Sequence, residues 1–205
     1  MNYKIDPRKL IETALLLAMG IVLSFVKIYT MPWGGSVTLC SMFPIILISY
    51  RYGIRWGLFS SFVYAILQMV IDISSLKAYS PITLVGSLCL DYLLGFGILG
   101  IGGLFRKVMK NPSFSLASGA TIAILGRYLC SFLSGLLLWG SYAEETLRSL
   151  GDTLADGILN QFSGWGLSAV YSAIYNAMYM LPELIATVIV CVLVATVPMI
   201  AKRMN

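Results

Sequence analysis

The stretch Gly86-Ser-Leu-Cys-Leu-Asp-Tyr-Leu-Leu-Gly-Phe-Gly-Ile-Leu-Gly-Ile-Gly-Gly-Leu-Phe105 is apolar enough to span a membrane, yet it contains Asp91. A carboxylate at the middle of a membrane helix costs roughly 2.5–3.5 kcal/mol on insertion scales. Such a residue normally faces the interior of a helix bundle and meets a partner there. The organisation of the whole chain therefore depends on what Asp91 faces.

The composition is typical of a membrane protein with several spans. Hydrophobic residues make up 59% of the 205 residues, charged residues make up 11%, and the mean hydropathy is +0.86. These values are far from those of soluble domains. The chain has no histidine, which is the commonest general base and metal ligand. Its four cysteines stand singly, so we expect no zinc site, no disulfide framework and no cofactor.

Six apolar segments alternate with polar connections. They cover residues 10–28, 37–50, 56–71, 82–105, 115–140 and 169–200. Most approach the ~20 residues that a helix needs to cross a bilayer, while the second and third are short. The sequence therefore predicts an all-α integral membrane protein, a single domain over residues 1–205 with six transmembrane helices. The first segment is interpreted as a membrane helix and not as a cleaved signal peptide.

Basic residues are distributed unevenly between the two sides of this predicted bundle. If both termini lie on one side, that side holds ten lysines and arginines, and the other side holds three. Cytoplasmic loops of membrane proteins carry an excess of Lys and Arg. We therefore expect both termini of this multi-pass membrane protein to lie in the cytoplasm. The asymmetry explains the pI near 9.0, so nucleic acid is not an expected partner.

The outer connection over residues 141–166 is long, polar and acidic. Its leucines and isoleucine recur at helical spacing, at Leu147, Leu150, Leu154 and Ile158. This pattern predicts an amphipathic helix on the outer surface of the membrane. A solvated cap on the bundle and a gating element are both compatible with it, and the cap is favoured.

Two small-residue motifs need a structural context before they carry a function. Gly95-Phe-Gly-Ile-Leu-Gly100 matches the dinucleotide pattern, but it lies inside a predicted membrane helix and indicates close helix packing. The absence of any Gly-Lys dipeptide excludes a P-loop, so this chain does not bind ATP through one. Ala14 and Ala18 form a small-xxx-small pattern, which suits packing inside the bundle and docking of a partner subunit equally well.

Three ionisable residues lie at or near membrane depth, namely Asp91, Arg127 and Glu183. They can form a structural ion pair, because such groups usually pair. One arginine neutralises only one of two carboxylates, however. If Glu183 takes Arg127 or reaches water, Asp91 remains negative and suits a cationic ligand, or becomes protonated.

Aromatic residues gather in the outer half of the predicted bundle. An interfacial aromatic belt explains Trp165 and Tyr142 well. It explains Tyr92 poorly, because Tyr92 follows the carboxylate of Asp91. Aromatic faces beside one carboxylate suit a flat cationic ring, at roughly 0.5–2 kcal/mol for each good face. Asn176 offers a donor and an acceptor to a heteroaromatic edge, or joins two helices.

At this point the chain resembles the thiamine-specific substrate-binding subunits, or S-components, of energy-coupling factor transporters. The resemblance covers most of the chain and the six-span layout. Its motifs are modest singly but specific in combination. The matching stretches are Met31-Pro-Trp-Gly-Gly-Ser-Val-Thr-Leu39, Phe43-Pro-Ile-Ile-Leu47 with Arg51-Tyr-Gly53, Leu90-Asp-Tyr92 with Gly102-Gly-Leu-Phe-Arg106, Gly126-Arg-Tyr128 through Ser134-Gly135 and Trp139, and Tyr171-Ser-Ala-Ile-Tyr-Asn176 with Tyr179-Met-Leu-Pro-Glu183.

The resemblance implies a transport role in the bacterial plasma membrane. Such a subunit captures thiamine from outside and reorients in the lipid bilayer against a transmembrane coupling subunit, which two ATPase subunits power. Ala14 and Ala18 match the motif that docks the coupling subunit. The first outer loop, with Trp33, resembles the lid of the family.

The resemblance also implies a site between the fourth, fifth and sixth spans, under the first loop. The matching residues are Asp91 and Tyr92 as the acidic-aromatic pair, Arg127 as a basic pocket residue, Gly135 and Trp139 on the fifth span, and Tyr171 and Asn176 on the sixth. The chain departs from the family at three points that border the site. Ser131 replaces a usual histidine, Trp33 replaces a common glutamine, and residues 141–166 are longer than expected. A thiamine precursor or analogue with a similar pyrimidine ring is therefore an alternative ligand.

Two rival functions belong to other classes. A membrane-embedded enzyme needs a nucleophile with a base, or a metal cluster, and neither is visible in this sequence. A structural or channel-like subunit does not need the aromatic residues around Asp91. We therefore expect a binding subunit that performs no chemistry on its ligand.

Overall fold

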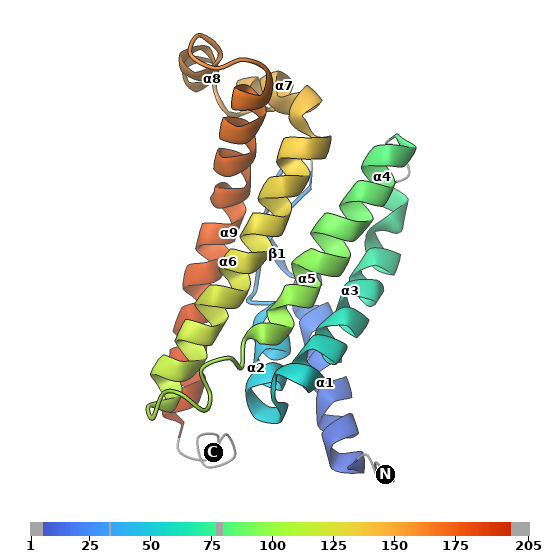
Figure 1. The fold of residues 1–205 in the computed structure, drawn as a ribbon, viewed down its shortest axis with the longest axis vertical. Coiled ribbons are helices and arrows are strands. Elements are labelled where there is room, and N and C mark those ends of the chain that lie inside the picture. The colour runs from blue at the N-terminus through green and yellow to red at the C-terminus, as the bar shows by residue number, and fades with distance from the viewer. Residues whose placement is uncertain (1–5, 33, 77–79, 198–205) are drawn as a thin grey trace.

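The computed structural model describes residues 6–32, 34–76 and 80–197. Trp33, which is expected to close the binding site as part of the first outer loop, lies outside the described residues. Within it, the protein is mostly helical, with one small β-hairpin near the N-terminus (Figure 1).

The N-terminal half contains three helices and the hairpin. They are α1 (Pro7–Phe25), β1 (Lys27–Thr30), β2 (Ser36–Thr38), α2 (Phe43–Tyr52) and α3 (Ile54–Leu76). The side chain of Asp6 caps α1 by accepting a hydrogen bond from the backbone N–H of Arg8. The two strands pair antiparallel, and Lys27 lies opposite Thr38 at the open end of the hairpin.

A single helical path with changing hydrogen-bond patterns follows α3. It consists of α4 (Pro81–Ser87), the π-helical segment η1 (Leu88–Leu94), α5 (Gly95–Gly97) and the 3₁₀ segment η2 (Ile98–Ile101). Asp91 lies in the middle of η1. Short π-helical segments occur mostly within α-helices and frequently at functional sites. The local geometry therefore draws attention to the same residue as the sequence does.

The C-terminal half consists of two long helices joined by a helical cap. Its elements are α6 (Pro112–Leu138), η3 (Gly140–Tyr142), α7 (Ala143–Leu150), α8 (Asp152–Leu159) and α9 (Gly164–Thr196). Helices α6 and α9 run side by side, and α7 and α8 lie across one end of the bundle (Figure 1). The beginning of α1 and the end of α9 lie at the opposite end.

Four of the described helical stretches are long and apolar enough to cross a membrane. They are Ile54–Ile73, Pro81–Ile101, Pro112–Leu138 and Gly164–Thr196. Over the second predicted span the structure differs from the expectation, because residues 36–38 form β2 and α2 is only 10 residues long. This is about half of the length needed to cross a bilayer as a helix. The count of six spans therefore stays a prediction.

Helix α2 is instead a core element of the bundle. Every residue from Phe43 to Tyr50 is buried. Its residues Ile45 and Ile46 belong to one apolar cluster with residues of α3, η2 and α6, which are Tyr64, Leu99 and Ile124 among others. A helix that is apolar on all sides is expected to be buried in this way.

Glycines allow the helical path around η2 to approach α3 closely. A Cβ atom on Gly100 would lie 2.5 Å from backbone atoms of Leu58. Interpreting Gly95–Gly100 as a helix-packing motif is consistent with this contact, since small residues let helix backbones approach.

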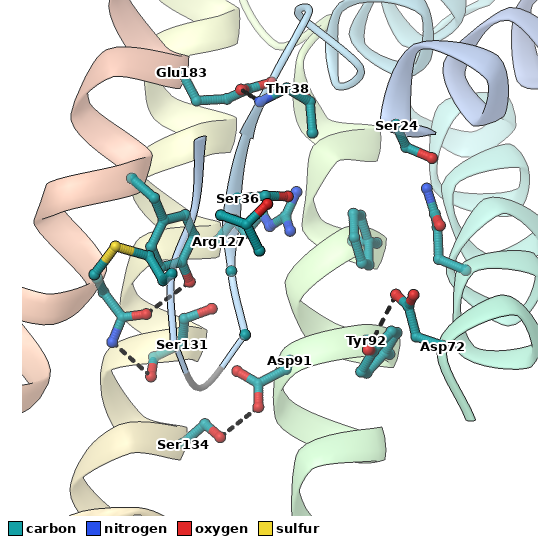
Figure 2. Close-up of a pocket in the computed structure, with 18 of the residues that line it drawn as sticks. Ser24, Ser36, Thr38, Asp72, Asp91, Tyr92, Arg127, Ser131, Ser134 and Glu183 are labelled. Carbon is teal, nitrogen blue, oxygen red and sulfur yellow. Dashed lines mark hydrogen bonds between the residues drawn. The ribbon is translucent and has the colours of Figure 1, made fainter. Parts of the chain in front are cut away.

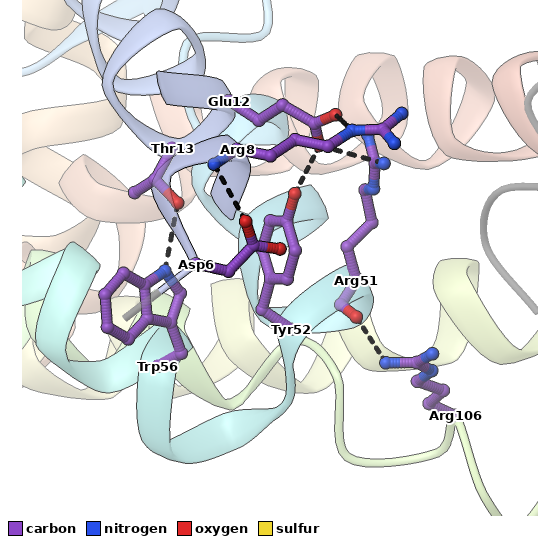
Figure 3. Close-up of polar contacts among 8 residues, drawn as sticks. All are labelled: Asp6, Arg8, Glu12, Thr13, Arg51, Tyr52, Trp56 and Arg106. Carbon is purple, nitrogen blue, oxygen red and sulfur yellow. Dashed lines mark hydrogen bonds and ion pairs between the residues drawn. The ribbon is translucent and has the colours of Figure 1, made fainter. Parts of the chain in front are cut away.

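A polar cluster ties α1 to the turn between α2 and α3 (Figure 3). Glu12 accepts a hydrogen bond from the Tyr52 hydroxyl and forms an ion pair with Arg51 over 2.9 Å. Nearby, Trp56 Nε1 donates a hydrogen bond to Thr13 Oγ1 over 2.9 Å. Glu12 therefore has partners, although it lies within the first predicted membrane span.

The outer segment forms two helices where the sequence predicted one. Gly151, with φ +144°, separates α7 from α8. Leu147 is fully buried, and Leu150 and Ile158 pack against the same apolar cluster. Leu154, in contrast, is 46% exposed. The hydrophobic spacing thus identified three of the four residues as packed, but neither the exposure of Leu154 nor the break at Gly151.

Candidate ligand-binding site

A cavity of about 450 Å³ lies in the half of the bundle near α7. It is enclosed by the β-hairpin, α3, η1, α6 and α9 (Figure 2). Each site residue predicted from the sequence that the structure describes lines this cavity. They are Asp91, Tyr92, Arg127, Ser131, Gly135, Trp139, Tyr171 and Asn176.

Asp91 projects from η1 toward α6 (Figure 2). Its Oδ2 accepts a hydrogen bond from the Ser134 hydroxyl over 2.5 Å. Within the described chain, neither Asp91 nor any other carboxylate forms an ion pair with Arg127. The carboxylate of Asp91 is thus available to a cationic group in the cavity.

Arg127 on α6 rests against an aromatic ring. Its guanidinium carbon lies 3.8 Å from the centroid of Phe96, a cation–π arrangement. The Nε atom of Arg127 is buried and has no hydrogen-bond partner among the described residues. The structural ion pair considered from the sequence is therefore absent from this part of the protein.

The aromatic residues of the site are held by polar contacts. The Tyr92 hydroxyl donates a hydrogen bond to Asp72 Oδ2 over 3.2 Å (Figure 2). Trp139 Nε1 donates to Ser87 Oγ over 3.1 Å. These contacts orient two aromatic side chains that line the cavity.

A row of tyrosines one helical turn apart forms the α9 wall. The ring centroids of Tyr171 and Tyr175 are 5.6 Å apart, and those of Tyr175 and Tyr179 are 6.3 Å apart. Of these three tyrosines, only Tyr171 was among the site residues predicted from the sequence. The spacing of four residues along a helix would have indicated the other two.

Asn176 and Gly135 hold α9 against α6. The Asn176 amide nitrogen donates to the carbonyl oxygens of Ser131 and Ser172, and its oxygen accepts a hydrogen bond from Tyr179 over 2.7 Å. A Cβ atom on Gly135 would lie 2.2 Å from Ser172 Oγ. Asn176 was expected either to contact a heteroaromatic ligand or to join two helices, and these contacts correspond to the second role.

The β-hairpin covers the cavity and contacts the tyrosine wall. The Tyr175 hydroxyl donates a hydrogen bond to the carbonyl oxygen of Gly34 over 2.7 Å. At Gly35, φ is +84° and a Cβ atom would lie 2.7 Å from the Tyr179 ring, so glycine suits this position doubly. Met31 of the same loop is buried. The described part of this loop, which resembles the lid of the family, therefore lies over the cavity.

Sequence reasoning missed two polar residues of α3, Gln68 and Asp72, which line the cavity. The third span predicted from the sequence ends at residue 71, whereas α3 continues to Leu76. The signal available in the sequence was their spacing of four residues, which places both on one face of a helix. Glu183 also lines the cavity, close to the hairpin.

The cavity has the chemistry of a site for a flat cation. In the described lining, the carboxylates of Asp72, Asp91 and Glu183 outnumber the cationic groups of Lys27 and Arg127. Aromatic rings contribute flat faces that attract positive charge. The volume falls within the ~300–1,000 Å³ typical of small-molecule sites.

Apolar helices around a cavity lined by polar and aromatic side chains indicate a membrane protein that binds a small molecule. The family model described as "Thiamine transporter protein" matches residues 10–150. The chain belongs to this thiamine transporter family, in agreement with the resemblance found in the sequence.

Individual relatives agree with the family match. The chain is 33% identical to the thiamine transporter ThiT of Bacillus subtilis over 156 residues, which cover 71% of this chain and 78% of that protein. It is 25% identical to ThiT of Lacticaseibacillus paracasei over 146 residues, which cover 66% and 70%. A solved structure of ThiT from Listeria monocytogenes has the same fold, with a TM-score of 0.67 and 22% identity over 94% of this chain and 96% of that one.

Proposed function

We propose that this protein is the substrate-binding subunit of an energy-coupling factor importer and that it captures thiamine from outside the cell. The observation that carries the proposal is the carboxylate of Asp91, which lies among aromatic side chains in an enclosed cavity without a cationic partner in the described chain. The thiazolium ring of thiamine is a flat cation, so it matches both features.

The site residues divide into those that contact the ligand and those that shape the cavity. Asp91 supplies the negative charge, and Trp139 supplies a stacking face. Tyr92 and Tyr171 orient the ligand, and Arg127 is a polar anchor. Gly135, Ser131 and Asn176 keep α6 and α9 at the correct separation, as their mutual contacts favour.

Delivery to the cytoplasm requires partner subunits. Ala14 and Ala18 are exposed on α1, next to exposed apolar side chains such as Leu15. This face is suited to a transmembrane coupling subunit. Because the sequence has no P-loop, ATP hydrolysis belongs to the two ATPase subunits. Membership of a transporter family supports binding without chemistry on the ligand.

The topology that goes with this function is a multi-pass protein of the plasma membrane. We place both termini in the cytoplasm, six spans in the bilayer, and the α7–α8 cap outside. The uneven distribution of basic residues supports this orientation. The position of the cavity in the half of the bundle near α7 agrees with capture from outside.

A thiamine precursor or analogue that retains the pyrimidine ring is the second candidate ligand. It is favoured by Ser131, which stands where the family usually has a histidine. Ser131 is buried in the cavity wall, where its carbonyl oxygen accepts a hydrogen bond from Asn176. We expect a change of side chain at this position to affect which ring the cavity accepts, because Ser131 lines the cavity.

Titration of the purified protein with thiamine, followed by tryptophan fluorescence, tests the proposal. Thiamine should quench the fluorescence at or below micromolar concentrations, because Trp139 lines the cavity. The Trp139→Phe variant should lose most of the quenching. Trp165 is 69% exposed and does not line the cavity, so Trp165→Phe serves as the control and should retain the quenching.

Two outcomes would decide against parts of the proposal. If micromolar thiamine causes no quenching in the unmodified protein, the thiamine assignment fails. If the isolated aminopyrimidine moiety binds more tightly than thiamine, the precursor is the ligand and the role of Asp91 as a thiazolium partner is rejected.

A further inference from the structure

Glu183 of α9 accepts hydrogen bonds from the last residue of β2, at the base of the β-hairpin (Figure 2). Its carboxylate accepts two hydrogen bonds from Thr38, one from the backbone N–H and one from the hydroxyl, and each is 2.7 Å long. The Ser41 hydroxyl lies 2.8 Å from Thr38 Oγ1. Glu183 is only 1% exposed, so these contacts are formed away from bulk water.

The hairpin is therefore attached to α9 at two points. At its tip, Gly34 accepts a hydrogen bond from Tyr175. At its base, Thr38 donates to Glu183. Both attachments hold the hairpin over the cavity, since Gly34, Thr38 and Glu183 line it. An outward movement of the hairpin that carries both Gly34 and Thr38 away from α9 would break these contacts.

The base attachment is the stronger of the two, because its acceptor is charged. Hydrogen bonds to a charged group stabilise more than neutral ones do. Loss of Thr38 would leave a buried carboxylate without its two donors, which is unfavourable unless another donor replaces them. A second partner for Glu183 would therefore make it easier for the hairpin to leave α9.

Arg127 meets the requirements for that second partner. It lines the same cavity, and among the described residues it forms no ion pair. Its Nε is buried and donates no hydrogen bond within that part of the chain. In the present arrangement its guanidinium rests on Phe96, a contact that holds the cation without using its hydrogen-bond donors.

We propose that Glu183 is a positioning residue that latches the hairpin closed through Thr38, and that Arg127 becomes its partner when the hairpin opens. The inference concerns access to the cavity, so its role in ligand entry rests on the proposed function. The latch consists of contacts within this chain alone, so it can be tested without a ligand. When the hairpin opens, Glu183 gives up the two hydrogen bonds from Thr38 and forms an ion pair with Arg127, which already lines the cavity.

Hydrogen–deuterium exchange of the ligand-free protein in lipid nanodiscs tests the latch. In Glu183→Gln, one carboxylate oxygen becomes an amide NH₂, which cannot accept from Thr38. The amides of residues 36–38 should then exchange about tenfold faster or more, while those of α6 keep their rates. Glu145 is exposed on α7, so Glu145→Gln is the matched control and should leave the exchange unchanged. Equal exchange in Glu183→Gln and the unmodified protein overturns the latch.

Thr38→Val provides an independent test that does not remove a buried charge. It keeps the backbone N–H and the size of the side chain but removes the hydroxyl donor. Exchange in β2 should accelerate by a smaller factor than in Glu183→Gln. If Glu183→Gln does not fold, this variant decides the matter, and unchanged exchange in it rejects the latch.

The Arg127→Gln variant tests whether Glu183 pairs with Arg127 when the hairpin opens. If Arg127 stabilises the open hairpin, its removal should slow exchange in β2, which is opposite to the effect of Glu183→Gln. In the Glu183→Gln background it should have no further effect. Faster or unchanged exchange in the single Arg127→Gln variant rejects the change of partner. Because no ligand is present, altered exchange in a protein that fails to bind thiamine would reject the proposed function and retain the latch.

Discussion

Ser134 on α6 donates a hydrogen bond to Asp91 on η1, with 2.5 Å between the two oxygens. This contact joins the two walls of the cavity and orients one carboxylate oxygen. The second oxygen of Asp91 can face a ligand. The charge that is unfavourable in an apolar helix thereby becomes the centre of a binding site.

Replacing Asp91 with asparagine should weaken thiamine binding strongly. The side chain keeps its size and can still accept from Ser134, but the charge is lost. Removing one partner of a buried charge pair costs roughly 2–5 kcal/mol, which corresponds to at least about thirtyfold weaker binding. Titration calorimetry on Asp91→Asn measures this loss, with Glu145→Gln as the control. Unchanged affinity would mean that the carboxylate serves the structure and not the ligand.

Asp72 and Tyr92 should act on binding as a pair. The carboxylate accepts the tyrosine hydroxyl over 3.2 Å, so either change alone frees the ring from its orientation. We expect Asp72→Ala and Tyr92→Phe each to weaken thiamine binding. The double variant should lose less binding free energy than the sum of the two single losses. Additive free energies in this double-mutant cycle would indicate that Asp72 contacts the ligand by itself.

Gly135→Ala should destabilise the bundle. The added methyl group would lie 2.2 Å from Ser172 Oγ, so α6 and α9 would have to separate. Overpacking of this kind costs typically 1–3 kcal/mol, and the thermal unfolding midpoint in detergent should fall accordingly. Gly157→Ala in α8 is the control, because no described atom lies within 4 Å of the position that its added methyl group would take. A midpoint that does not fall in Gly135→Ala would contradict the close contact of the two helices.

The outer cap should depend on Leu147 and hardly on Leu154. Leu147 is fully buried and Leu154 is 46% exposed, although both were predicted on one amphipathic face. Truncation of a buried leucine to alanine costs roughly 2–5 kcal/mol in water-soluble cores. Protease sensitivity of residues 141–166 should therefore rise in Leu147→Ala and stay nearly constant in Leu154→Ala. Equal sensitivity of the two variants would argue against the packed cap.

Ala18→Phe should separate binding from transport. Ala18 is exposed on α1, so a larger side chain leaves the cavity intact but prevents close approach of a partner helix. Thiamine affinity should stay unchanged, while uptake by cells that contain the coupling and ATPase subunits should fall severalfold. Ile185 is exposed on α9, and Ile185→Phe is the comparison at another apolar surface. Normal uptake with Ala18→Phe would remove α1 as the docking face.

Much of the site was predictable because its members have unusual properties in an apolar chain. Asp91, Tyr92 and Arg127 stand out as polar residues within or beside hydrophobic runs. Trp139 and Tyr171 lie at the ends of such runs. Each of these five lines the cavity.

Other features escaped because local patterns do not encode them. Residues 27–38 form strands of four and three residues, which are too short to show an alternating pattern clearly. Asp72 was assigned to a loop, because hydrophobicity decreases after Ile71 while the helix continues. The π-helical geometry of η1 depends on a shift of backbone hydrogen bonds, and no residue type specifies it.

Composition and hydropathy were enough to establish the class of protein, because long apolar segments with few charges are stable only in a membrane and a carboxylate within them needs a purpose. Which polar groups meet depended on tertiary packing. Thr38 and Glu183 are separated by 145 positions, yet packing of the hairpin on α9 makes them hydrogen-bond partners. Arg127 rests on Phe96 and not on a carboxylate for the same reason. Such pairings depend on the geometry of the assembled helices, which spacing along the chain does not specify.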